Sequence, residues 1–315
     1  MSQSTPDPAP FSKEKTFSSY SREQGNAYAK ARRDYHPSLY QTVLDRHTST
    51  GGQLNTLVDV GCGPGLAARA LAPNFAHVIG LDLSEGMLAT ARSMGGATAT
   101  SEPVSFQLSS AEQIGRDLSP PIQDGSVDLI TAANAAHWFD MSRFWQSAAH
   151  VLKPGGTVAL WTSGDIRAHP SMPNAAAIQT AIDIYLERHL MPYYEPGNRL
   201  SRNRYVDLPL PWTLELPVPE FDKGSLFRKD WGGGEQFFRG ETEVDLDMFE
   251  KIMATASPQT RWRQAHPELA GTDQDVLRIL RREIEVLLHE VGVEKGKETI
   301  KGTVNGTLLV VKKKT

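Results

Sequence analysis

The fold is decided by one stretch of the chain, Thr56-Leu57-Val58-Asp59-Val60-Gly61-Cys62-Gly63-Pro64-Gly65-Leu66. A short apolar run rich in β-branched residues, closed by glycines, is typical of a strand that ends in a turn. The segment that follows, residues 66–72, contains good helix formers and no breaker until Pro73. The sequence therefore predicts a strand, a glycine turn and a helix in immediate succession.

Such a turn gathers backbone N–H groups and a helix N-terminus at one point, where glycine permits a ligand to approach closely. A dinucleotide site usually carries glycines in the pattern G-x-G-x-x-G. Here Leu66 stands where that pattern requires its third glycine. Asp59 adds a carboxylate beside the turn, and this suits an amino group better than a phosphate.

The stretch Asp59–Gly65 resembles the first motif of class I S-adenosylmethionine-dependent methyltransferases. This resemblance implies that the cofactor is S-adenosyl-L-methionine and that Asp59, Gly61, Gly63 and Gly65 help to bind it. The alternative interpretation is an ordinary turn in an unrelated α/β protein.

The composition of the 315 residues is that of an ordinary globular protein, with 39% hydrophobic and 22% charged residues. A net charge of −4 argues against a general nucleic-acid binder. The single cysteine, Cys62, excludes an internal disulfide and a cysteine-based zinc cluster, and we expect no metal. No apolar run reaches the length of a membrane span, and the N-terminus lacks the pattern of a secretory signal, so a cytoplasmic protein is expected. Residues 1–12, rich in Ser and Pro, are predicted to be a disordered tail.

A second strand is predicted at 77–83, ending in Asp82. An acid at the tip of this strand can accept hydrogen bonds from the ribose hydroxyls of a bound nucleoside. Leu83 then lies where it can flank an adenine ring. A third strand, 103–108, is followed by Ala111 and Glu112. The family resemblance implies that these two residues hold the edge of the adenine; a simple helix start is the alternative.

A fourth strand, predicted to end near Ala133, is followed by the small residues Asn134 and Ala135, where a ligand can lie close. Amino-group methylases carry an Asn/Asp-Pro-Pro-Tyr/Phe loop at this place, and its prolines and aromatic residue are absent here. The sequence Ala-Ala-His-Trp-Phe-Asp at 135–140 instead resembles small-molecule methyltransferases related to the trans-aconitate methyltransferase-like enzymes of fungi. His137 is the candidate general base for a phenol or alcohol acceptor, whereas a carboxylate needs no base.

Four residues are candidates for the substrate site. Tyr28 and Arg32, spaced i, i+4 on one helix face, could line the mouth of the cofactor site. Trp138 and Tyr193 could face the substrate or the sulfonium. A surface role for the first pair and a core role for Trp138 are the alternatives.

The whole pattern predicts an α/β, Rossmann-like fold, because strands alternate with helices from Thr56 to Trp161. By resemblance, the sheet has seven mostly parallel strands in the order 3-2-1-4-5-7-6. We expect one domain, 13–315, with a cofactor-binding core at 52–163, a helical lid at 164–212, and a C-terminal part at 213–315 that completes the sheet. Its predicted strands include 213–218, 224–231 and 306–311, and its helices 244–256 and 272–291. The lysines at 312–314 are predicted to be a solvated tail.

Three functions remain open at this point. The first is a methyltransferase for a small-molecule acceptor, with oxygen, as carboxylate or hydroxyl, the expected acceptor atom. The second is a nicotinamide-dependent oxidoreductase on the same kind of sheet. The third is a regulatory protein that keeps the methyltransferase fold without turnover. The sequence leaves the oligomeric state open.

Overall fold

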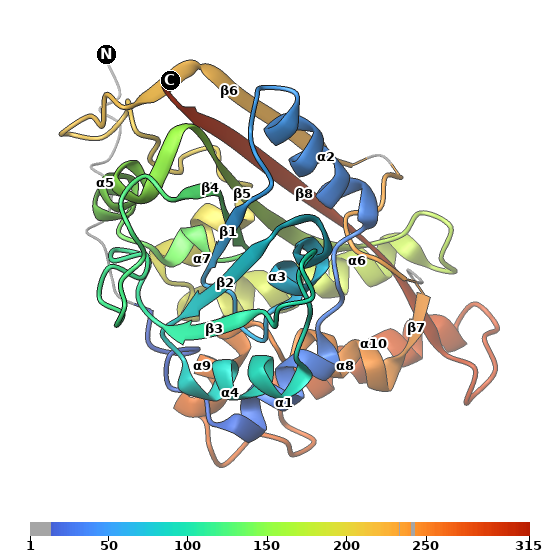
Figure 1. Ribbon diagram of the computed structural model, residues 1–315. Helices are drawn as coiled ribbons and strands as arrows, with labels where there is room; N and C mark the ends of the chain where they lie inside the picture. The colour runs from blue at the N-terminus through green and yellow to red at the C-terminus, as the bar shows by residue number, and fades with distance from the viewer. Residues whose placement is uncertain (1–13, 233, 241–242) are drawn as a thin grey trace.

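A twisted sheet runs through the centre of the computed structural model, which describes residues 14–232, 234–240 and 243–315 (Figure 1). The predicted tail at 1–12 lies outside the described residues. The eight strands are β1 (Thr56–Val60), β2 (His77–Asp82), β3 (Ser105–Leu108), β4 (Val127–Ala133), β5 (Leu152–Ala168), β6 (Phe221–Trp231), β7 (Glu243–Asp245) and β8 (Thr299–Lys313).

The sheet has the order β3-β2-β1-β4-β5-β8-β6, with β7 paired to β8. Strands β1 to β5 are parallel, and β8 lies antiparallel between β5 and β6. This order confirms the predicted Rossmann-like fold and its 3-2-1-4-5-7-6 arrangement. The predicted count of seven strands, which the family resemblance implied, does not include the three-residue strand β7.

The helices divide between the faces of this sheet and a separate helical layer. They are α1 (Arg22–Ala31), α2 (Pro37–Thr48), α3 (Leu66–Leu71), α4 (Glu85–Met94), α5 (Met141–Val151), α6 (Ala175–Ile184), α7 (Pro196–Arg202), α8 (Leu246–Met253), α9 (Ser257–Ala265) and α10 (Val276–His289). Short turns of other helix types are η1 (Ala72–Asn74), η2 (Ala136–Trp138), η4 (Met191–Tyr193) and the π-helix η3 (Tyr185–Leu190).

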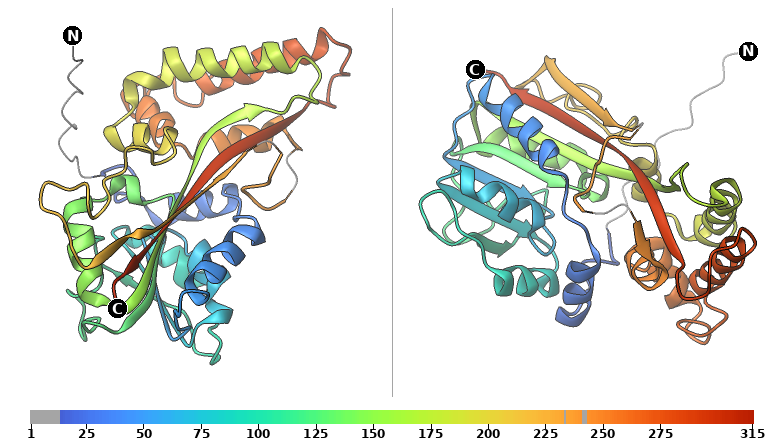
Figure 2. Two further views of the ribbon diagram at one scale, coloured as in Figure 1. Left: turned by 90° about the horizontal axis from the view of Figure 1, so that it is seen from above. Right: turned by 90° about the vertical axis from the view of Figure 1, so that its right-hand side faces the viewer.

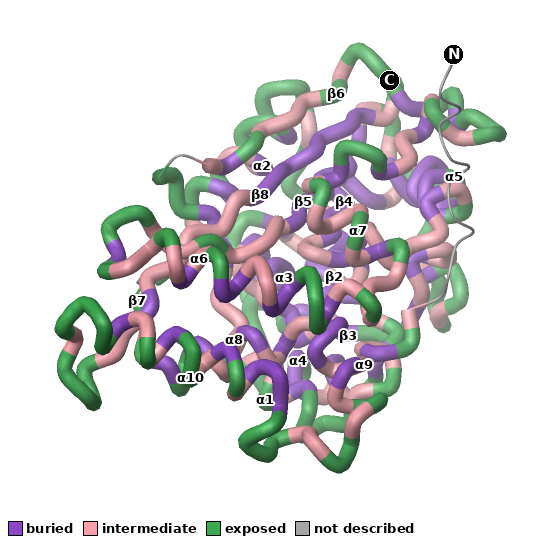
Figure 3. The backbone as a smooth tube through the Cα atoms, turned by 180° about the vertical axis from the view of Figure 1, so that it is seen from behind, coloured by how far each residue is buried: buried purple, intermediate pink, exposed green. Residues whose placement is uncertain are grey.

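Alternate residues of the strands enter two different cores, one on each face. Leu57 and Ala159 pack with α2, α3 and α4, whereas their neighbours Val58 and Val158 pack with α5 and the segment 205–221. The buried strands of the sheet are accordingly covered on both sides (Figure 3). Helices on both faces leave the carboxyl ends of the parallel strands as the place for a ligand.

A third core joins the predicted lid to helices much later in the chain. Residues of α6 and η3 pack against α8, α9 and α10 in one apolar cluster. The long strands β5 and β8 reach from the sheet to this helical layer, as Figure 2 shows. The helical layer therefore lies next to the C-terminal ends of β4 and β5.

Two expectations for the C-terminal part are wrong. Residues 213–218 form a turn and bends followed by irregular backbone instead of a strand. The prolines at 209, 211, 217 and 219 explain this, since proline cannot donate to a strand ladder. Lys314 is exposed as predicted, but Lys312 is buried with its Nζ 3.0 Å from Thr157 Oγ1, so the run as a whole is not a solvated tail. Lys313 Nζ donates to the carbonyl oxygens of Ala149 and Leu152.

Among the described helices, none combines the length and apolar character needed to cross a lipid bilayer.

Candidate functional site

The glycine turn after β1 joins the ends of β1 and β2. Cys62 N–H donates to Leu81 O at 2.9 Å, and Gly63 N–H donates to Asp82 Oδ2 at 2.8 Å. Gly61 has φ +65°, and a Cβ there would lie 2.6 Å from the Ala135 Cβ, so the turn and the loop after β4 are too close for any side chain.

Gly63 differs from its neighbours in facing open space. It has φ +53°, and a Cβ placed on it would meet no atom within 4 Å. Gly65, in contrast, is packed, because a Cβ there would lie 2.6 Å from the Phe106 ring. Only Gly61 and Gly63 of the three predicted glycines line the cavity described below.

Asp82 ends β2 with its carboxylate at the same edge of the sheet. Its Oδ1 accepts the Ser84 N–H at 2.8 Å, while Oδ2 accepts the Gly63 N–H. Burial raises the pKa of Asp82, and these two backbone hydrogen bonds oppose that shift. Each carboxylate oxygen has lone pairs left to accept further donors.

Asp59 does not line the cavity, contrary to the prediction that it binds a ligand directly. It is fully buried, and its carboxylate accepts the Ala68 N–H at 3.1 Å and the Thr131 hydroxyl at 2.7 Å. Burial raises the pKa of Asp59 to about 7, although both hydrogen bonds act to lower it. The residue thus ties the first turn of α3 to β4, beneath the glycine turn.

Because the pKa of Asp59 is about 7 in the folded protein and about 4 in an unfolded chain, stability is expected to fall as pH rises between these values. The folded state binds the extra proton in this window, so the free energy of unfolding drops by about 2 kcal/mol from about pH 5 to pH 7. Asp59→Asn should lose most of this pH dependence. Urea unfolding at pH 5 and pH 7 measures the free energy of unfolding, with the exposed Asp45→Asn as control. An equal fall in this free energy for wild type and Asp59→Asn would contradict the account.

The loops after β3 and β4 complete the edge. Ala111 is buried, and Glu112 Oε1 accepts the Asp140 N–H at 3.1 Å. Asn134 adopts the left-handed conformation with φ +52°. Its Oδ1 accepts the Thr162 hydroxyl and the Ser163 N–H, both at 2.8 Å, which fixes the end of β4 to that of β5.

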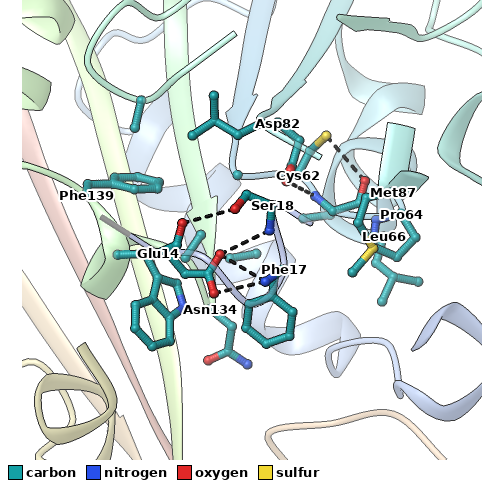
Figure 4. A pocket seen from close by; sticks show the side chains of 18 of the residues that line it. Glu14, Phe17, Ser18, Cys62, Pro64, Leu66, Asp82, Met87, Asn134 and Phe139 are labelled. Carbon is teal, nitrogen blue, oxygen red and sulfur yellow. Dashed lines mark hydrogen bonds between the residues drawn. The ribbon is translucent and has the colours of Figure 1, made fainter. Parts of the chain in front are cut away.

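These elements surround a first cavity of about 360 Å³. Of the predicted cofactor residues, the ones that line it are Gly61, Gly63, Asp82, Leu83, Ala111, Glu112, Asn134 and Ala135. Figure 4 shows Asp82, Asn134 and Phe139 around this cavity, with the segment from Glu14 to Ser18 lying across it. That segment is held by the Glu14 carboxylate, which accepts the N–H groups of Phe17 and Ser18.

A second cavity of about 260 Å³ lies beside the first, between the sheet and the helical layer. Seven residues line both cavities and are called the shared wall: Phe17, Tyr28, Arg32, Arg33, Asn134, Trp138 and Phe238. Three predicted substrate residues, Tyr28, Arg32 and Trp138, therefore lie between the two cavities. Beyond the wall the second cavity extends to α8, η3 and β8.

Comparison with known proteins identifies the family. A methyltransferase domain model (Methyltransf_11) matches residues 58–160. The chain is 30% identical over 204 residues to a Dictyostelium discoideum protein named "Putative methyltransferase", covering 65% of this chain and 69% of the relative. The chain belongs to the class I S-adenosylmethionine-dependent methyltransferases.

Two fungal relatives agree with this assignment over a smaller part of the chain, and one solved structure shares the fold. Methyltransferase AacuQ of Aspergillus aculeatus is 34% identical over 42% of this chain and 40% of its own length. Methyltransferase cfoB of Aspergillus candidus is 31% identical over 55% of this chain, and the match spans half of that relative's length, 50%. A structure titled a putative type II methyltransferase from Anaeromyxobacter dehalogenans has a TM-score of 0.58 and 21% identity, with 90% of this chain and 97% of that chain covered; it shares the fold.

In this methyltransferase His137 is placed poorly for a general base. It lines the second cavity but not the first, and its Nδ1 lies 3.0 Å from the Tyr205 hydroxyl. Burial, together with the positive charge of Arg32, lowers the pKa of His137 to about 3. A group of such low proton affinity accepts a proton weakly near neutral pH.

Tyr193 lies away from both cavities of the methyltransferase, so its predicted substrate role needs correction. Its hydroxyl is 2.8 Å from His266 Nε2, and its carbonyl oxygen accepts the Arg261 Nε–H. The short helix η4, which contains Tyr193, packs against α9, a helix for which the sequence carries no signal. These contacts place the Tyr193 ring in the helical layer.

Several further residues that line the cavities carry no recognisable signal in the sequence. Glu14 and Phe17 lie just after the predicted tail, and only the aromatic residues at 17 and 20 distinguish that segment. Asp165 and Arg202 line the second cavity as an ion pair at 2.7 Å, although 37 positions separate them (202 − 165). Within the ranges that the structure describes, no group of three or more His, Cys, Asp or Glu side chains could hold a metal ion.

Proposed function

We propose that the chain binds S-adenosylmethionine in the first cavity and directs methyl transfer to an oxygen of a small molecule held in the second. The observation that carries this proposal is the shared wall, since two adjoining cavities with common lining residues provide for a donor and an acceptor in contact. S-adenosylmethionine supplies an activated methyl group on a sulfonium. The protein's task is to align the two molecules and exclude water.

The lining of the first cavity has the chemistry that this cofactor needs. The Asp82 carboxylate keeps lone pairs to accept the two ribose hydroxyls. Because Gly63 has no side chain, the space beside its backbone is open to the cofactor, whereas any Cβ would occupy it. Leu83, 40% exposed, and Met87 offer apolar surfaces for the adenine, and Glu112 with the Ala111 backbone lies at its edge.

The second cavity is the proposed acceptor site. A carboxylate acceptor is already ionised and needs no base, which agrees with the weak basicity of His137. A hydroxyl acceptor would have to lose its proton to another group. Oxygen as the acceptor atom, and a carboxylate in particular, therefore fits the residues present.

His137 is expected to stay neutral throughout the physiological pH range, because its pKa is about 3. Its imidazole C–H resonance in proton NMR, assigned by its loss in His137→Gln, should not shift between about pH 5 and 8. A titration midpoint near the ordinary value of about 6.5 would contradict this placement and restore the general-base hypothesis.

Blocking the second cavity tests the proposal directly. Ile252→Trp on α8 places a large side chain at the lining, whereas Met248→Trp on the same helix is exposed and outside both cavities. With labelled S-adenosylmethionine and a mixture of small carboxylic acids and phenols, wild type and Met248→Trp should produce labelled products. Ile252→Trp should lose at least about 90% of this activity while still binding S-adenosylhomocysteine, because only the acceptor is displaced.

Two results would count against the proposal. Undiminished transfer by Ile252→Trp would move the acceptor elsewhere. Cofactor binding without transfer to any acceptor would favour the regulatory protein without turnover.

A further inference from the structure

Two arginines that line the second cavity, Arg202 and Arg32, differ in whether carboxylates neutralise their positive charge. Arg202 Nε lies 2.7 Å from Asp165, and its terminal nitrogen also pairs with Glu187 at 2.6 Å. This cluster therefore brings no uncompensated positive charge to the cavity.

Arg32 on the shared wall is in a different position. Its Nε–H donates to the Tyr28 hydroxyl at 2.9 Å, and its guanidinium lies 5.1 Å from the centre of the Tyr28 ring. Among residues 14–232, 234–240 and 243–315 it forms no ion pair, and its terminal N–H groups donate to no atom. A guanidinium has five N–H donors in a planar fork, so Arg32 has donors available toward the cavities.

The remainder of the second cavity is largely apolar. Its far walls include Leu186, Leu190, Phe249, Ile252, Ile300 and Val304. A ligand that fills this space needs an apolar body, and the end that meets the shared wall needs to accept hydrogen bonds from a cation.

We infer that the second cavity selects a carboxylic acid with an apolar body, whose carboxylate pairs with the Arg32 guanidinium at the shared wall. This inference rests on the proposed function, because it assigns the acceptor class of the same site. A carboxylate matches the planar fork with two parallel hydrogen bonds. An amine would add a further positive charge beside Arg32, and an alcohol would leave guanidinium donors unpaired.

The partnership with Tyr28 gives Arg32 a fixed orientation. The hydroxyl of Tyr28, four residues earlier in α1, accepts the Arg32 Nε–H. The two terminal nitrogens of the guanidinium are left to bind the ligand. Arg32 is thus a specificity-determining residue, and Tyr28 is a positioning residue that acts through it.

The inference is tested by calorimetric binding of four probes to the full chain saturated with S-adenosylhomocysteine. The probes are 3-phenylpropanoate, 3-phenylpropan-1-ol, 3-phenylpropylamine and acetate, which vary the head group and the body separately. The acid should bind at least tenfold tighter than the alcohol, and the amine and acetate should bind more weakly still. Equal affinities for acid and alcohol, a dissociation constant for acetate equal to that of the larger acid, or no binding of 3-phenylpropanoate at millimolar concentrations would each overturn the inference.

Substitutions then assign the preference to Arg32. Arg32→Gln should bind the acid and the alcohol equally. The control Arg22→Gln changes an exposed arginine at the start of α1, outside both cavities, and should keep the wild-type ratio. Arg32→Lys should retain part of the preference through its charge, and Tyr28→Phe should reduce it several-fold without abolishing it. These two variants keep the test decisive if Arg32→Gln does not fold. A preference unchanged in both Arg32→Gln and Arg32→Lys would overturn the assignment.

The two proposals fail in different ways. Loss of S-adenosylhomocysteine binding in wild type would remove the proposed function itself. Tight S-adenosylhomocysteine binding without a preference for the acid would remove the inference alone.

Discussion

Asp82→Ala is expected to weaken S-adenosylhomocysteine binding at least about 100-fold, while the protein remains folded. The carboxylate would accept two hydroxyl hydrogen bonds, and hydrogen bonds to a charged group contribute about 1.5–3 kcal/mol each. The substitution also frees the N–H groups of Gly63 and Ser84, which shape the turn. Calorimetric titration measures the affinity, and thermal unfolding checks that the fold persists.

Asp82→Asn removes the negative charge but keeps the shape of the side chain, so it measures the contribution of the charge to binding. One amide oxygen can still accept a backbone N–H, so an intermediate loss of about tenfold is expected. Asp45→Ala, at an exposed position of α2, should leave the affinity unchanged. Wild-type affinity in a folded Asp82→Ala protein would remove Asp82 from the proposed site.

Gly63→Leu is expected to abolish measurable S-adenosylhomocysteine binding. Its Cβ would project into open space of the first cavity, and the leucine side chain would occupy the volume that we assign to the cofactor. The matched control is Gly51→Leu, because Gly51 also has positive φ and no atom within 4 Å of a Cβ but lies outside both cavities.

Both leucine variants should lose a similar, small amount of stability, about 1 kcal/mol, since each adopts left-handed backbone. Only Gly63→Leu should lose binding. Equal binding by the two variants would show that the cofactor does not approach this turn.

The fold was largely predictable from local sequence, because strands β1, β2 and β4 are short apolar runs followed by turn or cap signals. Ser84 and Asp82 illustrate this, since the acid ends the strand and the serine caps α4. For Asp59, in contrast, the local sequence does not predict the direction of the side chain. Its position beside the turn was evident, but only the packing reveals that its carboxylate points to Ala68 and Thr131.

The acceptor side was less predictable, because it is assembled from distant segments. Arg32 and Tyr28 were found from helical spacing, whereas Ile252 of α8 and Ile300 of β8 meet in the second cavity although α9 and α10 separate them in the sequence. Tyr193 was assigned from its aromatic loop, and α9 with His266 decides its position instead. Such long-range packing leaves no periodic signal near any one residue.

The account is tested most directly by titrating the purified chain with S-adenosylhomocysteine, with NADH as a parallel ligand. We expect micromolar binding of S-adenosylhomocysteine to wild type and none of NADH. Binding of NADH alone, or no binding of S-adenosylhomocysteine at millimolar concentrations, would contradict the assignment of the first cavity.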